Sequence, residues 1–180
     1  PQGNSEHIIV ISPTDFHWGK YGPGYTKDPY DRSVAKQRLF ASTEELISRC
    51  LVKGKPEKII LAIGGDGLHI DNMQRNTTAG TPQDCDGTPE EIAWSWVELC
   101  VDYVSMVREY ADVCLFVVPG NHDYYTSIIM RSALHVFFRE DPHVEVVKGL
   151  SPRQYLTYGK NLLCFLHGDI GAVKDWPAII

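Results

Sequence analysis

The chain has 180 residues, of which 43% are hydrophobic and 22% charged, values that exclude a disordered or fibrous protein. A chain of this length buries a sizeable core without disulfides, so we expect a single domain over residues 1–180. The formal net charge of -6 argues against a general nucleic-acid coat protein. It is compatible with an enzyme that handles phosphate through bound metal ions.

The cysteines and the apolar runs indicate the compartment. None of the five cysteines forms a C-x-x-C pair, which favours a reducing compartment over a zinc ribbon. The longest apolar run, Val113–Val118, is much shorter than a membrane span, and the N-terminal segment has no signal-peptide pattern. We therefore expect a cytoplasmic protein with no membrane partner. The chain begins at Pro1 rather than Met, which indicates a piece of a longer protein.

Four short apolar runs, each followed by a polar turn, predict strands. Runs of this length that are rich in branched residues are typical of strands buried on both faces of a sheet. The runs are His7–Ile11, Ile59–Ile63, Val113–Val118 and Leu162–Leu166.

Helical patterns fill the segments between these runs. The clearest helix follows Thr88, where Pro89 and Glu91 predict a capping box. Strands that alternate with helices predict βαβ units, and therefore an α/β fold with a largely parallel sheet. The expected helices are Val34–Leu51, Ile92–Tyr110 and Ile128–Phe138 (capped by Thr126 and Ser127), with later strands near Val144–Val147 and Gln154–Tyr158.

Two long loops, Trp18–Ser33 and Asp71–Gly87, are expected to be binding elements or disordered. The stretch Gly19–Arg38 interleaves basic residues with tyrosines, a pattern that suits base stacking and contact with a phosphate backbone. The alternative is a solvated loop whose tyrosines pack on one another. The residues are Lys20, Lys27, Arg32, Lys36 and Arg38, with Tyr21, Tyr25 and Tyr30.

The most informative feature is the position of the Asp, Asn and His residues. The carboxyl ends of parallel strands meet at one edge of a sheet, so residues that follow different strands are expected to converge there. Carboxylate, amide and imidazole ligands together suit Mn, Fe or Zn better than Ca. A carboxylate shared by two metal ions would create a centre that clamps a phosphoryl group. The candidates are Asp15, His17, Asp66, Asn121, His122 and His167.

In this order, these motifs resemble those of the calcineurin-like metallophosphoesterase superfamily, namely D-x-H, G-D, G-N-H-[DE] and a lone His after a strand. The resemblance covers Val10–Asp169 and implies a layered β-sheet core flanked by helices. It also implies two divalent metal ions, with Mn as the first expectation and Fe, Co or Zn as alternatives. The matching segments are Asp15–His17, Gly65–Asp66, Gly120–Asp123 and Leu166–Gly168.

The resemblance assigns a role to each matching residue. Asp15 and His17 would hold one metal ion, Asp66 would bridge both, and Asn121 and His167 would hold the second. It also implies two catalytic residues, His122 and Asp123. His122 would contact the phosphate and protonate the leaving oxygen, and Asp123 would orient the ring of His122.

The final family motif, G-H-x-H, does not occur, because none of the seven histidines follows His167. The family draws one ligand for each metal ion from that motif. We therefore expect that the chain is truncated before it and lacks its last strands. Such a piece would bind metal weakly or fail to turn over.

The segment Gly65–His69 resembles the G-D-x-x-H variant of SbcD-type nucleases and of phage-encoded metallophosphoesterases. This resemblance places His69 near the nucleic acid, although packing against the following loop is an alternative. The expected function is hydrolysis of a phosphodiester in DNA, RNA or a nucleotide, with metal-activated hydroxide as the nucleophile. The alternatives are a phosphomonoesterase or protein phosphatase of the same superfamily, and a non-catalytic fragment or interaction module.

Overall fold

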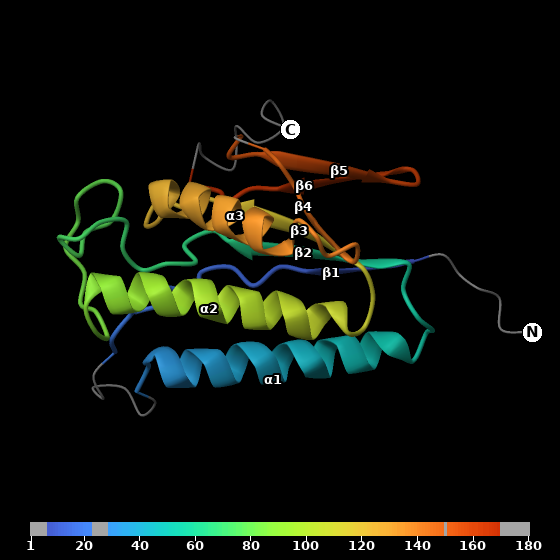
Figure 1. Ribbon diagram of the computed structural model, residues 1–180, viewed down its shortest axis with the longest axis horizontal. Coiled ribbons are helices and arrows are strands. Elements are labelled where there is room, and N and C mark those ends of the chain that lie inside the picture. The colour runs from blue at the N-terminus through green and yellow to red at the C-terminus, as the bar shows by residue number, and fades with distance from the viewer. Residues whose placement is uncertain (1–6, 23–28, 150, 170–180) are drawn as a thin grey trace, which may run out of the picture.

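The computed structural model describes residues 7–22, 29–149 and 151–169. In these residues the chain forms an α/β fold of three layers: helices, a four-stranded parallel sheet, and a β-hairpin (Figure 1). The sheet strands are β1 (Ile8–Ile11), β2 (Lys58–Gly64), β3 (Val113–Val118) and β4 (Val144–Val146). The helices are α1 (Arg32–Leu51), α2 (Pro89–Arg108) and α3 (Tyr124–Phe138).

The three helices cover the same face of the sheet. The strands lie side by side in chain order, β1-β2-β3-β4, and neighbouring strands are parallel. Because βαβ crossovers are right-handed, a sheet that grows in one direction places every crossover helix on one face. Residues of all three helices, such as Ile47 of α1, Ile92 of α2 and Met130 of α3, belong to the same core.

Alternate residues of the central strands supply two separate cores. In β2, Ile59, Leu61 and Ile63 belong to the large core beneath the helices. Ile60 and Ala62 point to the opposite face and belong to a smaller core that includes Phe165 of the hairpin. Burial of β2 and β3 on both faces explains why their sequences are almost entirely apolar.

Local signals fix the starts of the first two helices. The side chain of Asp31 accepts from the amide of Val34, and Thr88 and Glu91 form the expected capping box. Helix α3 begins at Tyr124, earlier than the sequence suggested, with Asp123 at the N-cap position but no side-chain cap from it. The prediction of Thr126 and Ser127 as caps was therefore wrong, since both lie inside the helix.

The fourth apolar run does not join the parallel sheet. It forms β6 (Asn161–Phe165), which pairs antiparallel with β5 (Gln154–Tyr158). Leu162 is 60% exposed, so the prediction of a strand buried on both faces was wrong for this segment. The hairpin is attached to the sheet through Gln154, whose Nε2 donates to the carbonyl of Val117 at 2.7 Å.

The long loop at residues 71–87 is folded against its surroundings. Asp71 accepts hydrogen bonds from the amides of Tyr125 and Thr126 at the start of α3. At the other end of the loop, Asp86 accepts from the backbone amide and Nε of Arg32. The loop is therefore attached at both ends, and it packs beside the carboxyl edge of the sheet.

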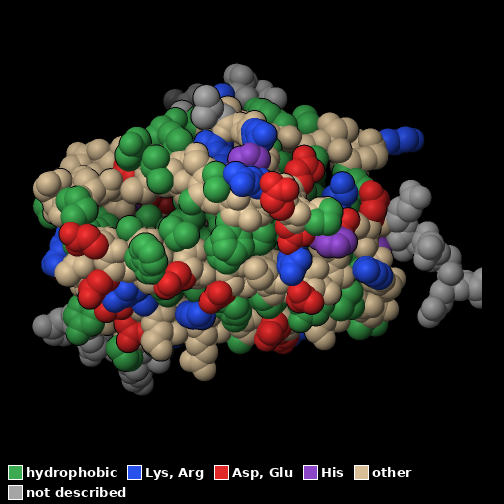
Figure 2. Space-filling view, viewed as in Figure 1, with side chains coloured by type: hydrophobic (Ala, Val, Ile, Leu, Met, Phe, Trp, Pro, Cys, Tyr) green, Lys and Arg blue, Asp and Glu red, His purple; other side chains and the backbone are tan. Residues whose placement is uncertain are grey.

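Much of the basic, tyrosine-bearing stretch takes part in the fold. Lys36 pairs with Asp102 of α2 at 3.1 Å, and the hydroxyl of Tyr30 donates to the carbonyl of Phe16 at 2.7 Å. Tyr25 and Lys27 lie outside the described residues. On the face seen in Figure 2, acidic and basic side chains are interspersed over the helices.

In the part of the chain that the structure describes, no helix combines the length and apolar content that crossing a membrane would require.

Candidate metal centre

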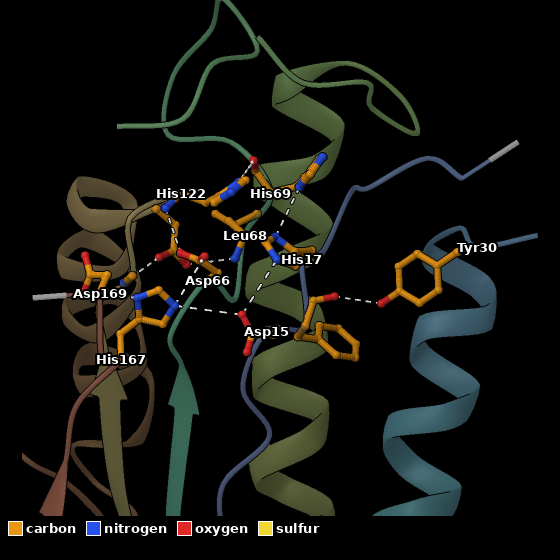
Figure 3. Close-up of polar contacts among 12 residues, drawn as sticks. Asp15, His17, Tyr30, Asp66, Leu68, His69, His122, His167 and Asp169 are labelled. Carbon is orange, nitrogen blue, oxygen red and sulfur yellow. Dashed lines mark hydrogen bonds and ion pairs between the residues drawn. The ribbon is translucent and has the colours of Figure 1, made fainter. Parts of the chain in front are cut away.

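Two loops at the carboxyl edge of the sheet run side by side and hold the first candidate ligands. The amide of Asp15, after β1, donates to the carbonyl of Gly65, after β2, at 2.8 Å. The amide of His17 likewise donates to the carbonyl of Asp66 at 2.9 Å. These hydrogen bonds continue the pairing of the two strands beyond their ends. The candidate ligands from both loops are thereby brought to one place (Figure 3).

The backbone of this site is strained. Four non-glycine residues among those described have positive φ, and three of them are candidate ligands: Asp15 (53°), His17 (48°) and Asp66 (64°). The left-handed region costs an L-residue roughly 1–2 kcal/mol relative to the right-handed one. Strain of this kind persists only where the surrounding structure enforces it, and it concentrates at functional sites.

The third loop, after β3, packs directly on Asp66. The amide of His122 donates to Asp66 Oδ1 at 2.7 Å. A Cβ atom at Gly120 would overlap the carboxylate and the backbone nitrogen of Asp66, so this position has to be glycine. The G-N-H-D segment therefore serves the packing of the site.

Asp123 has a different environment from the one that the resemblance implied. Its carboxylate is buried and accepts from the amide of Leu68 at 2.8 Å and from that of Gly120 at 3.0 Å. Burial raises the pKa of this carboxyl to about 6. Asp123 thus joins the loops after β2 and β3.

The ring of His122 is oriented by a main-chain group. Its Nδ1 lies 3.1 Å from the carbonyl oxygen of His69. A carbonyl can only accept, so Nδ1 carries a proton, and Nε2 is the ring nitrogen left for another partner. The ring-orienting role expected for Asp123 is therefore filled by the backbone of His69.

Asp15, His17 and Asp66 form an oxygen-rich cluster. One potential ligand atom from each residue lies within 4.8 Å of the other two. The Asp66 side chain is 5% exposed, whereas that of Asp15 is 68% exposed, so the cluster is open on one side. Two carboxylates and one imidazole suit a divalent transition metal such as Mn.

His167 reaches the same cluster from the hairpin layer. Its Nε2 lies 3.4 Å from Asp66 Oδ2 and 3.9 Å from Asp15 Oδ1. Its Nδ1 lies 3.3 Å from Asp169 Oδ1, an ion-pair contact that falls short of hydrogen-bond geometry. Asn121 lies in the turn between Gly120 and His122, with an exposed side chain.

Asp169 is a residue to which the sequence analysis gave no role. Metal-ligating histidines commonly direct their second ring nitrogen at a carboxylate, which fixes the orientation of the ring. The carboxylate two residues after His167 in the sequence could have been used to predict this arrangement.

A second cluster consists of His17, His69 and His122, whose ligand atoms also lie within 4.8 Å of one another. The Nδ1 atoms of His69 and His17 are 3.2 Å apart. Burial, together with the neighbouring His17 and His122, lowers the pKa of His69 to about 4. Burial is also the main cause of the lowered pKa of His17. His69 therefore lies beside His17 and His122 as a neutral imidazole at neutral pH.

Comparisons with protein-family models, curated proteins and solved structures find no match for this chain. Clustered carboxylates and imidazoles can hold divalent cations, and His122 offers a free ring nitrogen beside them.

Proposed function

We propose that the protein is a metal-dependent phosphodiesterase of the calcineurin-like metallophosphoesterase type. The observation that carries the proposal is the convergence of Asp15, His17, Asp66 and His167 on one cluster. They come from three separate turns, and the backbone of the first three is held in the left-handed region. A fold maintains such strain where a side chain is needed at a fixed position.

The cluster of Asp15, His17 and Asp66 has donor atoms that suit a divalent ion. The proposal places two ions at the site, with Mn as the first expectation. Asp15 and His17 would hold one ion, Asn121 and His167 the other, and Asp66 would contact both. When bound, such ions supply positive charge for a phosphoryl group and lower the pKa of water. Asp169, beside His167 Nδ1, would keep the ring of that ligand in place.

His122 is the residue proposed to handle the proton of the leaving group. The carbonyl of His69 holds its Nδ1, which leaves Nε2 for an exchangeable proton. The hydrogen bond from the main-chain amide of His122 to Asp66 keeps the His122 ring next to the proposed metal ligands. A positioned general acid of this kind contributes roughly 10²–10⁴-fold to a rate.

The preference for a diester is supported by His69. This residue is 5% exposed, and its ring lies against those of His17 and His122. A third imidazole beside the proposed acid offers a further hydrogen-bonding group to a substrate with substituents on both sides of the phosphorus. The diester would be a nucleotide or a nucleic-acid strand.

The test is Mn-dependent hydrolysis of bis-p-nitrophenyl phosphate and of p-nitrophenyl phosphate, with Mn binding measured separately by electron paramagnetic resonance. We expect the diester to be the better substrate and His122→Ala to reduce its hydrolysis by about 10²-fold or more. His143→Ala is the matched control, because His143 is an exposed histidine paired with Asp112 away from the site. A preference for the monoester would overturn the diester assignment. Bound Mn without any hydrolysis would overturn the catalytic one.

A further inference from the structure

We propose that His17, His69 and His122 form a second cation site, made of nitrogen ligands only, that prefers Zn²⁺ to Mn²⁺. The site shares His17 with the oxygen-rich cluster. Binding at this site does not depend on the proposed function. The consequence, inhibition when Zn²⁺ binds His122, does rest on the proposed function.

The spacing of the three imidazoles fits a tetrahedral ion. The Nδ1 atoms of His17 and His69 are 3.2 Å apart, and all three ligand atoms lie within 4.8 Å. Two nitrogens that each lie about 2.0–2.1 Å from a tetrahedral zinc ion are about 3.3 Å from one another. The first pair is thus already at the required separation, and a bound ion would replace the hydrogen bond that now joins these two nitrogens. The ring of His122 lies beside them, with one potential ligand atom within 4.8 Å of the other two.

The third ligand is prepared for coordination by its hydrogen bond. Because Nδ1 of His122 donates to the carbonyl of His69, the neutral ring has its lone pair on Nε2. A hydrogen bond from the second ring nitrogen to a carbonyl is the usual way in which a zinc-binding histidine is oriented. One residue, His69, therefore supplies a ligand with its ring and orients another with its backbone.

The two clusters differ in the kind of ion that they select. The cluster of Asp15, His17 and Asp66 offers two carboxylates, which suit Mn. Three imidazoles suit Zn, and the affinity order for divalent metals also places Zn above Mn. In His17, Nε2 faces Asp15 at 3.9 Å and Nδ1 faces His69, so one ring stands between the two clusters.

A zinc ion in the histidine cluster would occupy the nitrogen that His122 needs for proton donation. A protein with Mn in the oxygen-rich cluster would then lose activity as Zn²⁺ rises. Three protein ligands leave the fourth tetrahedral position open to water or to a phosphate oxygen.

Binding is tested with Co²⁺, whose tetrahedral complexes absorb strongly in the visible range. The background variant is Asp15→Asn, because Asp15 is exposed and its loss weakens only the oxygen-rich cluster. We expect this variant to bind one Co²⁺ with tetrahedral absorption, and Zn²⁺ to displace it. Adding His69→Ala should weaken the binding by at least about tenfold. Adding His143→Ala in its place should leave the binding unchanged.

Equal Co²⁺ affinity and absorption with and without His69→Ala would overturn the proposed site. His122→Ala is the second variant, in case His69→Ala does not fold by circular dichroism. It should cause the same loss, because it removes another of the three ligands. The Co²⁺ spectra do not depend on turnover, so an absence of diester hydrolysis would overturn only the proposed function.

The inhibitory consequence has its own measurement. Zn²⁺ added to the Mn-loaded wild-type protein should reduce diester hydrolysis. His69→Ala should need at least about tenfold more Zn²⁺ for the same fractional loss. Tetrahedral Co²⁺ binding together with full activity in saturating Zn²⁺ would overturn the inhibitory role.

Discussion

The main-chain amide of His122 donates to Oδ1 of Asp66 at 2.7 Å, so the loop that carries the proposed acid is attached to a proposed metal ligand. Asp66→Asn should separate these two roles, because an amide oxygen still accepts this bond but carries no charge. We expect the thermal stability to stay close to that of the wild type and the Mn affinity to fall at least about tenfold. Mn titration followed by electron paramagnetic resonance measures the affinity, and an unchanged affinity would contradict the role given to Asp66.

Gly120→Ala tests the close approach of the third loop to Asp66. The new Cβ would overlap the carboxylate and the backbone nitrogen of Asp66, so the loop must move. We expect a loss of about 1–3 kcal/mol in the free energy of unfolding, together with weaker Mn binding. Gly149→Ala is the matched control, because its Cβ would meet nothing closer than 3.8 Å. Equal effects of the two substitutions in urea denaturation would contradict the expected packing.

Asp71→Ala tests how the loop at residues 71–87 is held. The substitution leaves the amides of Tyr125 and Thr126 without the acceptor that caps the start of α3. Loss of a helix cap of this kind costs about 1–2 kcal/mol. We expect that loss in urea denaturation and faster cleavage of the loop by a protease. Asp84→Ala, which removes an exposed carboxylate of the same loop, should show neither effect.

Tyr103→Phe tests the buried contact between α1 and α2, where the hydroxyls of Thr43 and Tyr103 lie 2.8 Å apart. Near neutral pH the substitution should lower the free energy of unfolding by about 0.5–1.5 kcal/mol, the usual net value of one hydrogen bond. Burial raises the pKa of Tyr103 from 10.0 to about 12. Between these values the phenol ionises in the unfolded chain but not in the folded one, so its contribution to stability falls as the pH rises.

The difference in the free energy of unfolding between the wild type and Tyr103→Phe should therefore be constant below about pH 10 and shrink above it. Urea denaturation of both proteins at pH 7 and pH 10.5 measures this. A difference that grows with pH would contradict the burial of the phenol.

The parallel sheet and the start of α2 could be predicted because their signals are local. Thr88 and Glu91 are three residues apart and predict their own capping box. The start of α3 was missed because the acceptor for its first amides is Asp71, more than 50 residues earlier in the chain. A cap supplied by tertiary structure leaves no signal beside the helix that it serves.

Which sheet each strand joins was harder to predict, for a related reason. The run Leu162–Leu166 is as apolar as the central strands, and an unbroken apolar run does not say which faces are covered. In the structure this segment is an outer hairpin strand that contributes Phe165 to the smaller core. Its placement nevertheless brings His167 to Asp66, because the hairpin packs on the back of the sheet.

Within the site, the candidate ligands were identifiable from residue type and position, whereas the partners of Asp123 were not. Asp123 is next to His122 in sequence, yet its carboxylate turns to the amides of Leu68 and Gly120. Those contacts depend on how two loops fold over each other. Sequence adjacency therefore predicted a neighbour for His122 that the packing does not provide.

The left-handed backbone at Asp15 and His17 also bears on how such a site persists. Glycine adopts this conformation without penalty, so replacing either residue by glycine would relieve part of the cost at that position. An aspartate and a histidine at these positions are therefore less stable choices than glycine, and the proposed metal ligation would account for their presence.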